Sequence, residues 1–191
     1  MSSKNIFGET VRSLLFEITF PNNYPFSPPE VKYIAQNRIR IHPNIYVNGK
    51  VCLSILGTWS GPGWTTVMDI TNVLLTIQSL LDNDPLCNEP GYEKKSISKK
   101  DLYDNYNMAI KYNTINSLII NRIKYELGDF EIFRNTMIQY IKKYNDNILK
   151  NIEMDKNLKC NINLKVYYIN LDVDYMRLYD RYQKYYKIIK L

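Results

Sequence analysis

The spacing of hydrophobic residues changes period along this chain, and that change constrains the fold class most. Residues 14–20, LLFEITF, alternate between apolar and polar side chains, which predicts a half-buried strand. The face expected to be buried carries Leu14, Phe16, Ile18 and Phe20. From Thr66 the period becomes that of a one-sided helix, with apolar residues at Ile70, Val73, Leu74, Ile77, Leu80 and Leu81. Thr66 and Asp69 resemble a capping box at the start of this helix.

The rest of the chain adds a second strand and further helices. EVKYIA, residues 30–35, is typical of a strand, and it follows a connection, PNNYPFSPP, whose prolines fix φ and favour turns. Helices are expected at about residues 102–125, 130–144 and 171–189, with Gly128 ending the first of them. Alternation from Cys160 to Tyr168 indicates another strand. We therefore expect an α+β fold, a short antiparallel meander packed by helices.

Cysteine and histidine usage limits the chemistry that is open to the chain. Its three cysteines, Cys52, Cys87 and Cys160, are an odd number at unrelated spacings, which favours free thiols in a reducing compartment, the cytoplasm or the nucleus. One histidine and no CxxC pair offer too few ligands for a zinc site. We expect neither a metal nor a cofactor.

Charge and hydropathy bear on the classes of partner. The chain has no run of 18 apolar residues, so no membrane span is expected, and its start, MSSKNIFGET, lacks the pattern of a signal peptide. The net charge of +6 is concentrated in residues 94–191, where 19 lysines and arginines face 11 acidic residues. A basic half can bind nucleic acid, but no arginine cluster or aromatic RNA-binding motif accompanies it. Nucleic-acid binding is therefore not expected.

The segment IHPNIYVNGKVCLSIL, residues 41–56, contains the only histidine, His42, and Cys52, ten positions apart. Three interpretations compete for this pair. A cysteine protease uses histidine as the base of its thiol, but its cysteine normally lies at a helix start, far from the histidine in sequence. A metal site lacks further ligands. The third interpretation is a buried cysteine beside a histidine with a structural role.

The residues around this pair resemble those of the ubiquitin-conjugating enzymes. His42-Pro43-Asn44, then seven residues and Cys52, reproduce the HPN-x7-C spacing of that family, and YPFSPPEV before it and Trp64 after it fit as well. YVNGKVCLSILGTWSGPGW and NEPGYE are similar to the large, extended members. The resemblance covers residues from about 12 to 125, and it implies a conjugating core over residues 1–127 with a mainly helical extension over residues 128–191.

The resemblance implies a role for each residue of the segment. Cys52 would accept ubiquitin, or a ubiquitin-like modifier, as a thioester and pass it to a lysine amine or a ligase. Asn44 would stabilise the oxyanion of lysine attack, or only pin the loop beside Cys52. His42 would be structural and bond the backbone, with Pro43 and Trp64 also structural. The family also carries an acidic side chain that helps to deprotonate the attacking lysine. In one alignment, which we favour, Asp84 stands at that position, and in the other Asn88 does.

The resemblance also implies partners, and the chain departs from the family in two places. The implied partners are the modifier, an activating enzyme, a ubiquitin ligase that contacts Phe26, and protein substrates. The usual Ser-Pro-Ala after the tryptophan is here Thr65-Thr66-Val67. Family members also begin with a helix and a strand before FEITFP, whereas this chain starts almost at that second strand. The helix normally meets the activating enzyme, so we expect slow charging. A non-catalytic interaction module with the same fold is the alternative.

Overall fold

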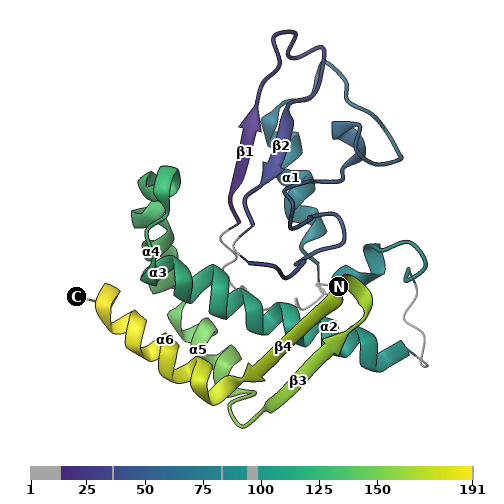
Figure 1. The fold of residues 1–191 in the computed structure, drawn as a ribbon. Coiled ribbons are helices and arrows are strands. Elements are labelled where there is room, and N and C mark those ends of the chain that lie inside the picture. Colours follow the sequence, from purple (N-terminus) through teal and green to yellow (C-terminus); the bar gives the residue numbers. More distant parts are fainter. Residues whose placement is uncertain (1–13, 36, 83, 94–98, 191) are drawn as a thin grey trace, which may run out of the picture. The chain divides into compact units, whose positions relative to one another are not determined.

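The computed structural model describes residues 14–35, 37–82, 84–93 and 99–190 (Figure 1). They form two compact units, one from Leu14 to Tyr103 and the other from Asp104 to residue 190. Both units combine helices with a small antiparallel sheet, so the predicted α+β class is confirmed. The boundary predicted after residue 127 stays a prediction. The expected absence of an N-terminal helix and first strand concerns residues 1–13, which lie outside the described residues.

The sheet of the first unit is the predicted pair of strands. β1 (Phe16–Thr19) runs antiparallel to β2 (Glu30–Tyr33). An isolated bridge between Lys32 and Lys50 brings the next extended segment to β2, and the Tyr33 N–H donates to the Gly49 carbonyl over 2.8 Å. Within the described residues the expected meander is therefore two strands with a few additional bridges.

The burial of β1 departs from the predicted alternation at both ends. Phe20, expected on the buried face, is 50% exposed, because the strand ends at Thr19 and its ring lies edge-on against Tyr24 in the proline-rich turn, 4.9 Å between centroids. Leu15, expected on the outer face, is buried. Leu15 lies just before the first residue of β1, and its carbonyl accepts the Ile34 N–H over 2.8 Å, so it stands at the end of the ladder in which the alternation was predicted.

The first long helix is α1 (Ile70–Leu80), and its start lies later than predicted. Asp69 is the N-cap and accepts from the Thr71 and Asn72 N–H groups, while the Asn72 side chain accepts from the Asp69 N–H. The capping box is thus Asp69 with Asn72 rather than Thr66 with Asp69, because the backbone up to Met68 still follows a turn. The buried stripe is also narrower than predicted.

Only Val73 and Ile77 of α1 are buried, and Leu74 is 47% exposed. A stripe with one residue per turn is narrower than the face that a helix usually buries in a globular protein. Within the part of the chain that the structure describes, the exposed leucines of α1 therefore lie at the surface and not in the core.

The predicted helix over residues 102–125 is a continuous run with a change of winding in the middle. α2 (Lys100–Asn113) passes into the π-helix η4 (Thr114–Ile120), and α3 (Asn121–Lys124) completes it. Six of the seven residues of η4 are buried. A π-helix bonds each N–H to the carbonyl five residues earlier, so its side chains do not repeat on the α-helical period.

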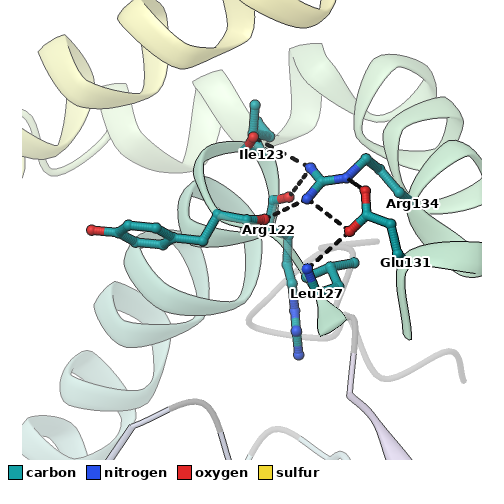
Figure 2. A network of polar contacts seen from close by, with 6 residues as sticks. Arg122, Ile123, Leu127, Glu131 and Arg134 are labelled. Carbon is teal, nitrogen blue, oxygen red and sulfur yellow. Dashed lines mark hydrogen bonds and ion pairs between the residues drawn. The ribbon is translucent and has the colours of Figure 1, made fainter. Parts of the chain in front are cut away.

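The run ends at Tyr125, which is extended, and not at Gly128. The Arg134 guanidinium donates to the Arg122 carbonyl over 3.0 Å and also to the carbonyls of Ile123 and Tyr125 (Figure 2). These are carbonyls at the helix end, where no further intrahelical N–H follows. An arginine from the following helix therefore caps α3, and the glycine signal at Gly128 misplaced the end.

The expected third helix is divided into shorter ones. η5 (Gly128–Phe133) is a 3-10 helix, α4 (Arg134–Lys143) follows it, and α5 (Asn145–Glu153) follows α4. Glu131 of η5 pairs with Arg134 and accepts the Leu127 N–H over 2.9 Å, so the cap of α3 also fixes the start of α4 (Figure 2).

A hairpin in the second unit corrects the prediction for the C-terminal part. The strand predicted from Cys160 to Tyr168 is β3 (Lys159–Leu164), and it ends early because Val166–Tyr168 form a 3-10 helix. A second strand, β4 (Ile169–Asp174), includes Leu171, which the apolar spacing places in the last helix. Leu171 lies opposite Ile162 in the antiparallel ladder. The apolar side chains of both strands lie on one face, whereas the outer face is polar, with Lys159, Asn161, Asn163, Asn170, Asp172 and Asp174.

The last helix, α6 (Tyr175–Lys190), packs against η4 and α5 (Figure 1). It buries Tyr175, Leu178 and Tyr182. Burial raises the pKa of the phenols of both Tyr175 and Tyr182. The Tyr182 hydroxyl donates to Asn145 Oδ1 over 3.1 Å, whereas the Tyr175 hydroxyl has no hydrogen-bond partner among the described residues. The predicted helical C-terminal part is confirmed, with a hairpin in addition.

Candidate active site

The predicted site lies on an extended loop between β2 and the short 3-10 helix η1 (Ser54–Leu56). Isolated bridges from His42 to Ile45 and from Ile45 to Val51 fold this loop back on itself. The reversal needs Gly49, whose φ is +99° and whose added Cβ would lie 2.9 Å from Lys32 Cγ. The loop therefore brings the HPN turn beside Cys52.

His42 organises the HPN turn through the backbone. Its Nδ1 accepts the Asn44 N–H over 3.0 Å, and its carbonyl accepts the Ile45 N–H, also over 3.0 Å. The side chain is completely buried. Nδ1 is thus an acceptor to the backbone, as befits a histidine that shapes the turn.

Asn44 and Cys52 hold each other by two hydrogen bonds. The Cys52 N–H donates to the Asn44 carbonyl over 2.8 Å, and Asn44 Nδ2 donates to the Cys52 carbonyl over 2.9 Å. One N–H of the Asn44 amide is therefore engaged with the backbone of the cysteine. An oxyanion would have to be bound by the other N–H, or after this bond opens.

Thr58 is a residue of this site that sequence reasoning missed. Its hydroxyl donates to the Val51 carbonyl over 2.7 Å and accepts the Leu53 N–H over 2.9 Å. The two residues on either side of Cys52 are thereby joined by one side chain. A hydroxyl six positions after the cysteine carried no signal, because the contact depends on Gly57, which reverses the chain at a φ of +69°.

The Cys52 thiol lies in a buried position, with the residue only 1% exposed. A thiol that attacks an acyl group must be reached by a second protein. In the arrangement described here, Cys52 is largely shielded from solvent.

Asp84 and Asn88 lie at the two ends of a 3-10 helix, η2 (Pro85–Asn88), where Asp84 is the N-cap. Asn88 Nδ2 donates to Asp82 Oδ2 and to the Pro85 carbonyl, both over 3.2 Å. The Asn88 amide thus bonds within its own loop. The assignment of the acidic position to Asp84 stays a prediction, and Cys87 is half-buried between the two.

Phe26 lies in the proline-rich turn, and Trp64, from a later loop, packs against that turn. Trp64 Nε1 donates to the Pro25 carbonyl over 2.7 Å, and its ring lies 6.0 Å from that of Tyr24. Phe26 is 77% exposed, and Val67 is also open to solvent. Trp64 therefore fixes the turn that presents Phe26, the side chain expected to contact a ligase.

Neither a metal-ligating cluster nor a membrane-spanning helix occurs among the described residues. No group of three or more His, Cys, Asp or Glu side chains that could hold a metal ion occurs in residues 14–35, 37–82, 84–93 and 99–190. None of the helices in those same ranges is long and apolar enough to cross a membrane.

A family model described as ubiquitin-conjugating enzyme matches residues 13–113, which include the HPN turn, Cys52, Thr58 and Asp84. The chain belongs to the ubiquitin-conjugating enzyme family. It is 39% identical over 134 residues to ubiquitin-conjugating enzyme E2 Z of Xenopus tropicalis, covering 69% of this chain and 42% of that protein. The human protein of the same name is 40% identical over 134 residues, covering 69% and 37%.

The chain thus spans less than half the length of these conjugating-enzyme relatives. Among solved structures, the E2 domain of a ubiquitin-conjugating enzyme of Toxoplasma gondii is similar with 25% identity and a TM-score of 0.43, covering 59% of this chain and 71% of that one. The family assignment rests on the sequence matches, and with it the predicted conjugating-enzyme fold is confirmed.

Proposed function

We propose that this member of the family conjugates ubiquitin, or a ubiquitin-like modifier, through a thioester on Cys52. The observation that carries the proposal is the pair of hydrogen bonds by which Asn44 holds the backbone of Cys52. Both residues lie in a segment that the conjugating-enzyme family model matches. A pure binding module needs neither the thiol nor the side-chain amide that holds it.

The first step of the proposed reaction is transthiolation. The Cys52 thiolate attacks the carbonyl carbon of the modifier's thioester on the activating enzyme. The new C–S bond forms, the old C–S bond breaks, and the thiolate of the activating enzyme leaves and takes up the proton that Cys52 gave up. No metal or redox step enters this balance.

The second step is attack by a lysine amine or by a ligase cysteine. A neutral amine adds to the carbonyl carbon, the oxyanion collapses, and the Cys52 thiolate leaves as the amide forms and the nitrogen loses its proton. In our proposal Asp84 assists that proton loss. Phe26 and the turn fixed by Trp64 would meet the ligase, and the protein substrate supplies the lysine. We place the reaction in the cytoplasm or nucleus.

A second candidate function is a conjugating-enzyme-like module that binds partners without being charged. The observation in its favour is the burial of Cys52, because a thiol that stays buried cannot accept a modifier. The two functions differ in one measurable property, the formation of a thioester.

Charging with activating enzyme, ATP and ubiquitin, followed on a non-reducing gel, tests the proposal. We expect a band that disappears on reduction. Cys52→Ser should convert it to a more stable oxyester or abolish it, and Cys87→Ser and Cys160→Ser are the matched controls that should charge normally. A reducible band that persists in Cys52→Ala would refute the assignment, and no band with wild-type protein would favour the module.

A further inference from the structure

Arg40 contacts three different parts of the site. Its guanidinium donates to the Pro43 carbonyl in the HPN turn. The guanidinium carbon lies 3.6 Å from the centroid of the Tyr46 ring, on the segment that leads toward Cys52. The same group lies 4.0 Å from Glu89 Oε2, in the loop that carries η2.

These contacts join two segments that are far apart in sequence. One is the HPN turn, whose Asn44 holds Cys52. The other is residues 84–93, where the Glu89 N–H donates to the Leu86 carbonyl at the end of η2. Of the ion pairs described, Arg40–Glu89 therefore links the segment of the nucleophile to the segment of the candidate acid, Asp84.

The chemistry of arginine suits this position. Its planar group can donate along its edge to a carbonyl, attract a nearby carboxylate by its charge and stack its face on an aromatic ring, a combination that the ammonium of a lysine cannot reproduce. The Arg40 side chain is only 15% exposed and that of Glu89 28%, so water and salt screen the pair less than they screen a surface pair.

We propose that Arg40 is a positioning residue, which sets the segment of Asp84 relative to the HPN turn and Cys52 for attack by lysine. This inference rests on the proposed function. Arg40 itself takes no part in proton or acyl transfer. Its loss should therefore affect the nucleophile that needs the acid, a lysine, more than a nucleophile that does not.

The test uses the charged full chain and two nucleophiles in single-turnover discharge, free lysine and dithiothreitol. We expect Arg40→Gln and Glu89→Gln each to slow lysine discharge by about tenfold. That factor corresponds to the loss of one modest pairwise interaction, here the Arg40–Glu89 pair, on the way to the transition state. Discharge to dithiothreitol, which does not require deprotonation of an amine, should change by less than about twofold, and Arg40→Lys should restore part of the lysine rate.

The double variant and a matched pair complete the design. Arg40→Gln with Glu89→Gln should be no slower than either single variant, because both remove the same link. Lys111 and Asp155 form an ion pair of similar exposure, 15% and 35%, in the other unit, and Lys111→Gln and Asp155→Asn should leave both rates unchanged. Additive effects of the two site variants, or equal slowing with lysine and dithiothreitol, would overturn the proposal.

Hydrogen exchange tests the coupling without any charging reaction. Arg40→Gln should speed exchange of the Glu89 N–H, and Glu89→Gln should speed exchange of the Ile45 N–H, which donates to the His42 carbonyl across the HPN turn. If wild-type protein cannot be charged, the proposed function fails, and these two measurements still decide whether Arg40 couples the two segments. Exchange that each variant changes only in its own segment would overturn it.

Discussion

Replacing Asn44 by alanine separates the two roles that the sequence left open for this residue. The change removes the 2.9 Å bond from Nδ2 to the Cys52 carbonyl, and Asn44 is only 8% exposed, so water reaches the site poorly. A buried acceptor left without a partner costs about 1–3 kcal/mol. For a chain of this size each kcal/mol lowers the melting temperature by roughly 2–4 °C, so a loss near the middle of that range predicts a fall of about 4–8 °C.

The assay compares melting, thioester formation and lysine discharge in the same preparation. Because Asn44 pins Cys52 in the structure, we expect Asn44→Ala to lower all three. Asn48→Ala is the control, since Asn48 is exposed on the same loop and accepts a hydrogen bond from the Lys50 N–H over 3.1 Å rather than holding Cys52. An unchanged melting temperature and normal charging, together with lysine discharge slower by about 10²-fold, would refute the pinning role and establish the oxyanion role.

Further predictions concern hydroxyl groups. Thr58→Val removes the hydroxyl that links the two neighbours of Cys52, and we expect it to slow charging by about tenfold. Thr58→Ser keeps the hydroxyl, and its charging rate should stay within about twofold of wild type. Equal rates for the two variants would contradict the role of the hydroxyl. Tyr175→Phe should not lower the free energy of unfolding in urea, because its hydroxyl is buried without a partner among the described residues. Tyr182→Phe should lower that free energy by about 1 kcal/mol, because it loses the bond to Asn145. Because burial raises the pKa of both phenols, stability should be full below about pH 10 and fall as the pH rises above it, and Tyr175→Phe should reduce that fall in alkaline melting curves.

Local periodicity was sufficient for several elements of the fold. The strands around residues 16–19 and 30–33, α1, and the long helix from Lys100 were predicted, because each repeats an apolar pattern over its own length. β4 was missed since Leu171 fits both the two-residue period of INLDVD and the helical stripe that continues in α6. Only the pairing with Ile162 in β3 resolves that ambiguity, and pairing is not a local property.

The site shows the same division between local and distant information. The HPN turn and Cys52 lie within eleven residues of one another, so their spacing alone brought attention to them. Arg40 and Glu89 are nearly fifty positions apart, and no pattern in the sequence connects them. The Arg134 cap of α3 spans a much shorter stretch of sequence, but it too left no pattern, since it acts through backbone carbonyls that any residue would provide.

The π-helix η4 has a consequence for aligning this chain with its relatives. The family match ends at residue 113, and the winding changes at Thr114. A turn closed by bonds to the fifth residue back holds one residue more than an α-turn, so the segment accommodates an insertion without breaking the helix. We expect a relative whose helix stays α throughout to lack one residue here. A gapless alignment of the two would then assign core positions to surface ones in everything that follows.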